Sequence, residues 1–183
     1  GEPRQLLGIK RQQQDYTAAI DYARGRAPAL PLVLWGTSFS SAHVITLAAR
    51  RDDVAAVIAM NPMLDGRASS LLKLKDAGPG TFLRMTGVGL ADLARGCLGR
   101  GPRYLPLAGE PGTLAALSAP DALTGILSFV DDDFDNRIAP RALLALGLYR
   151  PVTRARQVHC PVLLQLCLRD SVAPIAPGYR LAE

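Results

Sequence analysis

Ser38 lies in a sequence context that is typical of a nucleophilic serine. The stretch Trp35–Ser40 follows the apolar run Leu32-Val33-Leu34 and leads into a mostly apolar segment that should form a helix. A sharp strand-to-helix turn of this kind, a nucleophile elbow, lifts a serine hydroxyl out of a sheet. Gly36 supplies the small neighbour that the turn needs, whereas Ser40 stands where glycine is usual. The alternative is a Gly-Ser turn whose hydroxyls cap the helix.

Asp170 is the candidate acid, in Leu168-Arg169-Asp170-Ser171 after a third apolar run. In acyl transfer an acid orients the base that deprotonates the serine, and backbone N–H groups hold the oxyanion. The N–H of Phe39 would be one such donor. Asp65 also follows a predicted strand and competes for the acid role, although a turn at Asp65-Gly66 is the favoured interpretation. Asp170 itself has the alternative of a turn or helix cap.

Neither histidine of the chain fits the base. His43 lies five residues after Ser38 in the predicted buried helix, so we expect a core histidine. His159 precedes the last predicted strand and should lie at the opposite edge of the sheet from Ser38. No histidine follows Asp170 before Glu183. We therefore expect the triad histidine outside this chain, and the isolated 183-residue piece to be inactive and poorly soluble.

Alternating strands and helices must position these residues. The apolar spacing of residues 11–24 predicts an amphipathic helix, and residues 40–50 predict a buried one. The predicted strands are Leu32–Trp35, covered on both faces, Val54–Met60 and Pro161–Leu168. This alternation predicts an α/β fold with a parallel sheet and right-handed crossovers. Because sites form at the carboxyl ends of such strands, Ser38, Asp65 and Asp170 should gather along one edge.

Residues 66–156 have a different texture, in which glycines and prolines separate short helical pieces. The insert is far longer than an ordinary connection between strands. We interpret it as a helical lid over the site, in a single domain over residues 1–183 whose core is 1–65 and 157–183. Lid helices are expected at 69–75, 81–98, 112–118, 120–129 and 138–147.

Composition restricts the partners. The net charge is +5 and the pI about 9.4, but the basic residues are scattered and aromatics make up only 5%, so we expect no nucleic-acid partner. Cys97, Cys160 and Cys167 lack CxxC spacing, which argues against a zinc site or disulfide framework and favours a reducing, cytoplasmic setting. No apolar run is long enough to span a membrane. No nucleotide or metal motif is present, so neither a cofactor nor a metal is expected.

These residues resemble the α/β-hydrolases, especially the bacterial branch of serine aminopeptidase-like and dienelactone-hydrolase-like proteins. The resemblance runs over nearly the whole chain. It is carried by Gly1–Arg4, residues 15–24, Leu34–Ser40 with His43, and residues 160–174. It implies that strands five to seven of the family's sheet are present, with Ser38 as nucleophile and Asp170 as acid.

The resemblance also implies that this chain is an internal fragment. The loop with the second oxyanion donor and the loop with the histidine belong to the family's other segments. The implied activity is hydrolysis of a small-molecule ester or amide through an acyl-enzyme, with peptidase, esterase and lactonase all open, as is the oligomeric state. A non-catalytic α/β-hydrolase scaffold, favoured only by Ser40, and a degenerate fragment are the alternatives.

Overall fold

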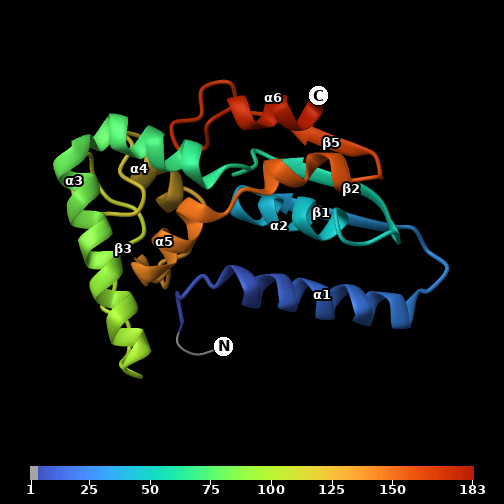
Figure 1. The fold of residues 1–183 in the computed structure, drawn as a ribbon, viewed down its shortest axis with the longest axis horizontal. Coiled ribbons are helices and arrows are strands. Elements are labelled where there is room, and N and C mark those ends of the chain that lie inside the picture. Colours follow the sequence, from blue (N-terminus) through green and yellow to red (C-terminus); the bar gives the residue numbers. More distant parts are fainter. Residues whose placement is uncertain (1–3) are drawn as a thin grey trace. The chain divides into compact units, whose positions relative to one another are not determined.

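The computed structural model describes residues 4–183, and its contacts divide them into two compact units (Figure 1). Residues 1–3, which carry part of the resemblance at Gly1–Arg4, lie outside the described residues. The sheet unit consists of Gly8–Ala68 and Tyr149–Glu183. The insert unit consists of Ser69–Leu148 and the described residues up to Leu7. Residues 149–156, which we had assigned to the lid, therefore group with the sheet. The single-domain assignment stays a prediction.

Three parallel strands form the sheet, as the alternation of elements predicted. The strands are β1 (Leu32–Thr37), β2 (Val54–Met60) and β5 (Val162–Gln165), in the order β1-β2-β5. β5 is shorter than expected and ends at Gln165 rather than Leu168. Thr37 pairs with Met60, and Met60 pairs with Gln165. The three strands thus end side by side, and the chain leaves all of them at one edge.

Helix α2 provides the main contact with the sheet. It runs from Phe39 to Ala48 and packs against β1 and β2, while α1 (Ile9–Arg26) packs against α2 (Figure 1). As expected, α2 is buried almost all round, with every residue from Ser41 to Ala48 buried. The 3₁₀ helix η1 (Pro151–Gln157) contacts α2 and α6 (Ala176–Ala182).

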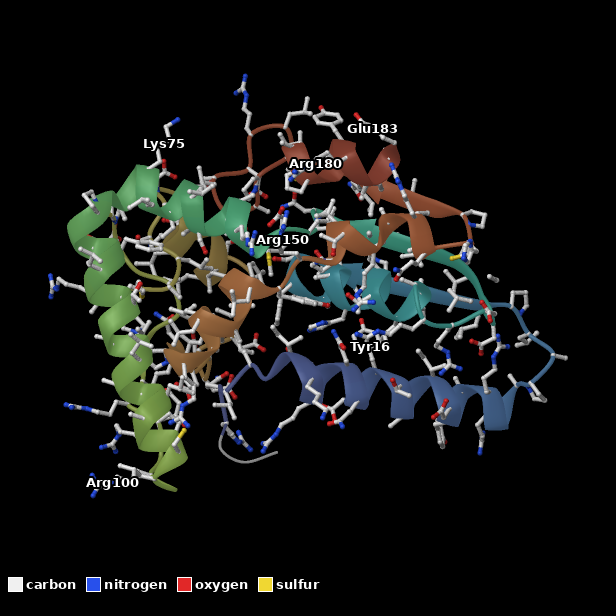
Figure 2. The ribbon with its side chains drawn as sticks, viewed as in Figure 1. Tyr16, Lys75, Arg100, Arg150, Arg180 and Glu183 are labelled. Atoms are coloured by element: carbon white, nitrogen blue, oxygen red, sulfur yellow. The ribbon has the colours of Figure 1, made fainter. Side chains whose placement is uncertain are left out.

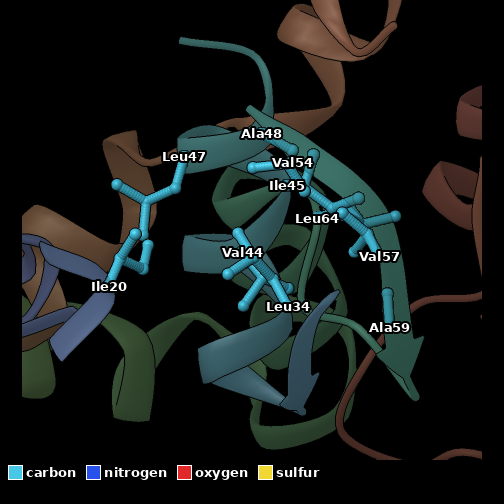
Figure 3. Close-up of a cluster of buried hydrophobic side chains, with 10 residues drawn as sticks. All are labelled: Ile20, Leu34, Val44, Ile45, Leu47, Ala48, Val54, Val57, Ala59 and Leu64. Carbon is cyan, nitrogen blue, oxygen red and sulfur yellow. The ribbon is translucent and has the colours of Figure 1, made fainter. Parts of the chain in front are cut away.

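A cluster of buried aliphatic side chains joins these elements (Figure 3). Val44, Ile45 and Leu47 of α2 meet side chains from β1 and β2. Burying one such side chain contributes about 1.5–3 kcal/mol. The cluster consists of Ile20, Leu34, Val44, Ile45, Leu47, Ala48, Val54, Val57, Ala59 and Leu64.

The expectation that β1 is covered on both faces is wrong for the described residues. Val33 is 48% exposed and Trp35 is 55% exposed, whereas Leu34 between them is buried. Successive side chains of a strand point to opposite faces, so α2 covers only one of them. On β5, Leu163 is likewise 63% exposed. An apolar run alone cannot distinguish a strand packed on two faces from one packed on a single face.

The insert unit is only partly the helical segment that its sequence predicted. Helix α3 (Gly66–Cys97) begins in the sheet unit and is interrupted at Gly78, whose φ is 77°, so the expected break between helices 69–75 and 81–98 is confirmed. α4 (Ala122–Leu127) and α5 (Arg141–Leu148) match the last two predicted helices. No helix of the described residues is long and apolar enough to cross a membrane.

The predicted helix at 112–118 is wrong. Gly112 has a φ of 81°, and Leu117 forms a bridge with Ala108 instead of a helical turn. Its backbone N–H donates to the carbonyl of Leu107, so the segment is tied laterally rather than along a helix. A short antiparallel pair that the sequence did not predict, β3 (Leu105–Pro106) with β4 (Arg137–Ile138), lies in the same unit.

A buried ion pair joins α3 to α5 within the insert unit. Asp92 is 1% exposed and accepts hydrogen bonds from Nε and Nη2 of Arg141 at 2.6 and 3.1 Å, and from the backbone N–H of Arg103. Burial alone would raise the pKa of Asp92, but these hydrogen bonds outweigh it and hold the pKa below its usual range. Removing one partner of such a pair is costly because a buried charge is left unpaired.

We predict that Gly96→Ala destabilises the insert unit. A Cβ at Gly96 would lie 1.8 Å from Nη1 of Arg141, so the guanidinium would have to shift and its hydrogen bonds to Asp92 would weaken. We expect the free energy of unfolding to fall by about 1.5–3 kcal/mol, measured as a lower thermal unfolding midpoint of the complete natural protein. Gly87→Ala on the same helix is the matched control, because a Cβ there meets nothing within 4 Å. We expect this substitution to raise the free energy of unfolding by about 0.5–1 kcal/mol. Equal midpoints for the two variants would contradict this account.

Candidate active site

The backbone of Ser38 is strained in the way an elbow requires. Its φ is 51° and its ψ is −117°, a combination that non-glycine residues rarely adopt. Two backbone hydrogen bonds hold it there: its N–H donates to Met60 at 2.9 Å, and its carbonyl accepts from the N–H of Met63 at 3.2 Å. Such strain costs about 1–3 kcal/mol and persists only where the surrounding structure enforces it. The side chain of Ser38 is exposed at the end of β1.

The two neighbours of Ser38 that the sequence singled out play different parts. A Cβ at Gly36 would lie 2.7 Å from the carbonyl oxygen of Ser40, so only glycine fits there. Ser40, which stands where glycine is usual, causes no such conflict. Its hydroxyl accepts the N–H of Thr37 at 2.9 Å and donates to the Thr37 carbonyl at 2.8 Å. The serine therefore closes the turn with its own side chain.

The helix-capping alternative does not hold for Ser38. Ser38 is the residue that precedes α2, yet within the described residues its side chain makes no capping hydrogen bond. Phe39 is the first residue of the helix, and the first N–H groups of a helix have no partner inside it. The hydroxyl of Ser38 and the N–H of Phe39 thus lie next to each other at the end of β1.

Asp170 lies in the loop after β5 and accepts several hydrogen bonds. Its Oδ1 accepts the backbone N–H groups of Val172 at 2.6 Å and Ala173 at 2.5 Å, which is the turn that the sequence allowed for. Its Oδ2 accepts a hydrogen bond from the side-chain amide of Asn61. The carboxylate is half-buried and fixed in orientation.

Asn61 is the residue that sequence reasoning missed. It directly follows β2, and the prediction that this strand ends at Met60 assigns no role to the next residue. The segment Met60–Met63 bonds to Ser38 through its backbone and to Asp170 through Asn61. The structure thus brings the two predicted residues to one segment at the carboxyl edge of the sheet. The sequence signal was a polar residue at a strand end beside the other candidates.

Asp65 belongs to a separate, structural cluster. The sequence favoured a simple turn at Asp65-Gly66. Instead, Oδ1 of Asp65 accepts the backbone N–H groups of Arg67 and Ala68, so Asp65 caps α3. It is 3% exposed and pairs with Arg150 through both oxygens at 3.0 Å, and with Arg180 at 3.3 Å. Figure 2 labels these two arginines. Burial would raise the pKa of Asp65, but the bonds from Arg150 and the backbone outweigh it and keep the pKa low. Through these bonds Asp65 connects the start of α3 to Arg150, which directly precedes η1, and to Arg180 of α6.

His43 is a core histidine, as the sequence predicted. It is 2% exposed, its Nδ1 lies 3.2 Å from the hydroxyl of Tyr149, and its Nε2 lies 3.2 Å from Oε1 of Gln12. The ring of Phe39 packs edge-on against it, with centroids 4.6 Å apart. Burial lowers the pKa of His43 from 6.5 to about 4, so it is neutral at ordinary pH. Within the described residues neither His43 nor the exposed His159 bonds to Ser38 or Asp170.

The carboxyl edge of the sheet carries groups of three kinds that acyl transfer uses. A strained serine, an adjacent helix-start N–H and an oriented carboxylate are three of the parts that such chemistry requires. Among residues 4–183, no group of three or more His, Cys, Asp or Glu side chains gathers to hold a metal ion.

Solved structures share this architecture. α/β Hydrolase GrgF from Penicillium sp. sh18 superposes with a TM-score of 0.71 at 19% identity, covering 100% of this chain and 61% of that one. The chain has the α/β-hydrolase fold. The monoacylglycerol lipase of Paleococcus ferrophilus shares that fold, with a TM-score of 0.63, 18% identity and coverage of 98% of this chain and 62% of the other. The fold expected from the elbow and the acid loop is thus confirmed.

A curated protein is similar to this chain in sequence. The quorum-quenching protein AidA of Acinetobacter baumannii (strain MDR-ZJ06) is 40% identical over 187 residues, which cover 100% of this chain. The chain spans 60% of the length of that relative. No protein-family model matches the chain.

We predict that His43 stays neutral until the pH falls well below 6. The unfolded chain binds a proton near pH 6.5 that the folded chain does not bind until about pH 4. The contribution of the buried neutral ring to the free energy of unfolding is therefore complete above pH 6.5. It decreases as the pH falls from 6.5 to about 4, by at most about 1.4 kcal/mol per pH unit.

The measurement is an NMR titration of the C2 protons of His43 and His159 in the complete natural protein, with His43→Gln and His159→Gln to identify their signals among those of all its histidines. A His43 midpoint near 6.5 would show that the ring is not buried as described.

Proposed function

We propose that the protein carrying this chain is a serine hydrolase that cleaves an ester or amide through an acyl-enzyme. Ser38 attacks the carbonyl carbon, and the N–H of Phe39 helps to hold the oxyanion. Asp170 orients a histidine that lies outside this chain, and that histidine accepts the proton of Ser38 and later delivers it to the leaving group.

The strained backbone of Ser38 is the observation that supports this proposal most strongly. A serine that merely capped α2 would need neither a φ of 51° nor a glycine whose Cβ position is blocked. The hydrogen bond that orients Asp170 adds to this support, because an acid of a triad must hold one direction toward its base. The scaffold alternative loses its only argument, since the hydroxyl of Ser40 is accommodated by two hydrogen bonds.

The substrate class is proposed more broadly. We infer a small molecule with a partly apolar acyl group, and the role of the insert as a lid stays a prediction. The description of AidA as quorum-quenching makes a small signalling molecule with an ester, lactone or amide bond a suitable candidate. The serine aminopeptidase-like and dienelactone-hydrolase-like branch is compatible with the same bonds, and a cytoplasmic location remains part of this proposal.

The test uses the complete natural protein. A fluorescent phosphonate should label one serine, which peptide mapping identifies as Ser38, and Ser38→Ala should abolish labelling. Turnover of p-nitrophenyl esters, a lactone and an amino-acid p-nitroanilide then identifies the bond that is cleaved. We expect Ser38→Ala to lower turnover by about a millionfold, the usual effect of removing a triad nucleophile.

Ser128→Ala is the control, because this exposed serine follows α4 and, within the described residues, its hydroxyl bonds only to the carbonyl of Gly125. It should label and turn over like the wild type. Labelling elsewhere, or full activity in Ser38→Ala, would refute the proposal.

A further inference from the structure

We propose that Asn61 is a positioning residue that holds the carboxylate of Asp170 in the direction of the triad base and ties it to the turn that carries Ser38. This inference rests on the proposed function. Asn61 would not touch the substrate; it would act through Asp170.

Three polar groups of Asn61 bond to the segment Gln165–Asp170. Its backbone N–H donates to the carbonyl of Gln165 at 2.7 Å. Its Oδ1 accepts the N–H of Cys167 at 3.2 Å, which fixes the orientation of the amide. Its Nδ2 is thereby directed at Oδ2 of Asp170 and donates to it. One side chain thus fixes both the start of the loop and the carboxylate that the loop carries.

The hydrogen bonds of Asp170 leave a defined position for the base. A carboxylate offers about four lone-pair positions, two on each oxygen. Within the described residues Oδ1 accepts two backbone N–H groups, from Val172 and Ala173, and Oδ2 accepts one from Asn61. The remaining position is on Oδ2, where an imidazole N–H would bind. Asn61 therefore determines which oxygen meets the base and from which side.

The backbone of Asn61 shows that this arrangement is enforced. Its φ is 47°, which is uncommon for a residue with a side chain, although asparagine tolerates it better than most. It also precedes Pro62, and residues before proline favour extended conformations. Strain at such a position is maintained only where the surrounding contacts enforce it.

The residues around Asn61 connect this strain to the nucleophile. The carbonyl of Met60 accepts the N–H of Ser38, and the N–H of Met63 donates to the carbonyl of Ser38. Ser38 and Asn61 are the strained residues that follow β1 and β2. Ser38 bonds to the end of β2 through Met60, and Asn61 bonds to the end of β5 through Gln165. A displacement of Asn61 would therefore disturb the acid directly and the serine through two backbone bonds.

The test compares Asn61→Gly with Asn61→Asp in the complete natural protein. Glycine accepts the positive φ but removes the amide, so it separates the side chain's role from that of the backbone. Each variant is first titrated with the phosphonate to count functional Ser38, and turnover is then expressed per titrated site. We expect Asn61→Gly to titrate fully, to keep KM within about twofold, and to lose about 10- to 100-fold in kcat, which corresponds to a lost hydrogen bond to a charged group.

Asn61→Asp supplies a readout that a purely structural role would not move. Aspartate matches the shape of asparagine but places a carboxylate against Asp170, so the ionised variant should be less active than Asn61→Gly at pH 8. Once protonated, the new side chain can donate to Oδ2 again. The activity ratio of Asn61→Asp to Asn61→Gly should therefore rise as the pH is lowered toward 5.

The outcomes separate the two proposals. Wild-type kcat per titrated site in Asn61→Gly, or a pH-independent ratio between the two variants, would overturn the role of Asn61 while Ser38→Ala remains inactive. Full activity of Ser38→Ala would instead overturn the proposed function.

Discussion

The common end of three parallel strands is the constraint on which the site depends. Thr37, Met60 and Gln165 are partners in one row of the sheet, so the next residue of each strand leaves at the same edge. The pairing of the strands therefore places Ser38, Asn61 and the loop of Asp170 at one edge of the sheet, independently of their side chains. The strain at Ser38 and Asn61 follows from the same geometry, because each chain must turn sharply within hydrogen-bonding reach of its neighbour.

The buried helix α2 enforces this geometry because it packs against β1 and β2. Its first residue follows Ser38, and its side chains fill the aliphatic cluster against β1 and β2. His43 contributes to the same end as a neutral core residue: it packs on Phe39 and bonds to Tyr149 and Gln12, which fixes the first turn of the helix. A helix that could shift would let the turn relax, and the N–H of Phe39 would lose its direction. The packing of the core thus positions the group proposed to hold the oxyanion.

The sequence was informative where local chemistry determines structure. The apolar runs, the glycine at Gly36 and the order of strands and helices predicted the parallel sheet, the elbow turn and the buried α2. It failed where long-range packing decides. Nothing local shows that only one face of β1 is packed, or that Leu117 bonds laterally to Leu107 instead of continuing a helix. The ion pairs of Asp65 and the amide of Asn61 depend on partners 85 to 115 residues away, which no local pattern can reveal.

The central claim is that the strained turn presents Ser38 as a nucleophile beside an N–H donor. A crystal structure of the complete natural protein after phosphonate treatment tests it most directly. The account predicts a bond from phosphorus to Oγ of Ser38, a positive φ at that residue, and a phosphonate oxygen about 2.7–3.1 Å from the N–H of Phe39. A phosphonate bound at another residue, or a Ser38 whose φ has relaxed to negative values with no donor at the oxygen, would contradict it.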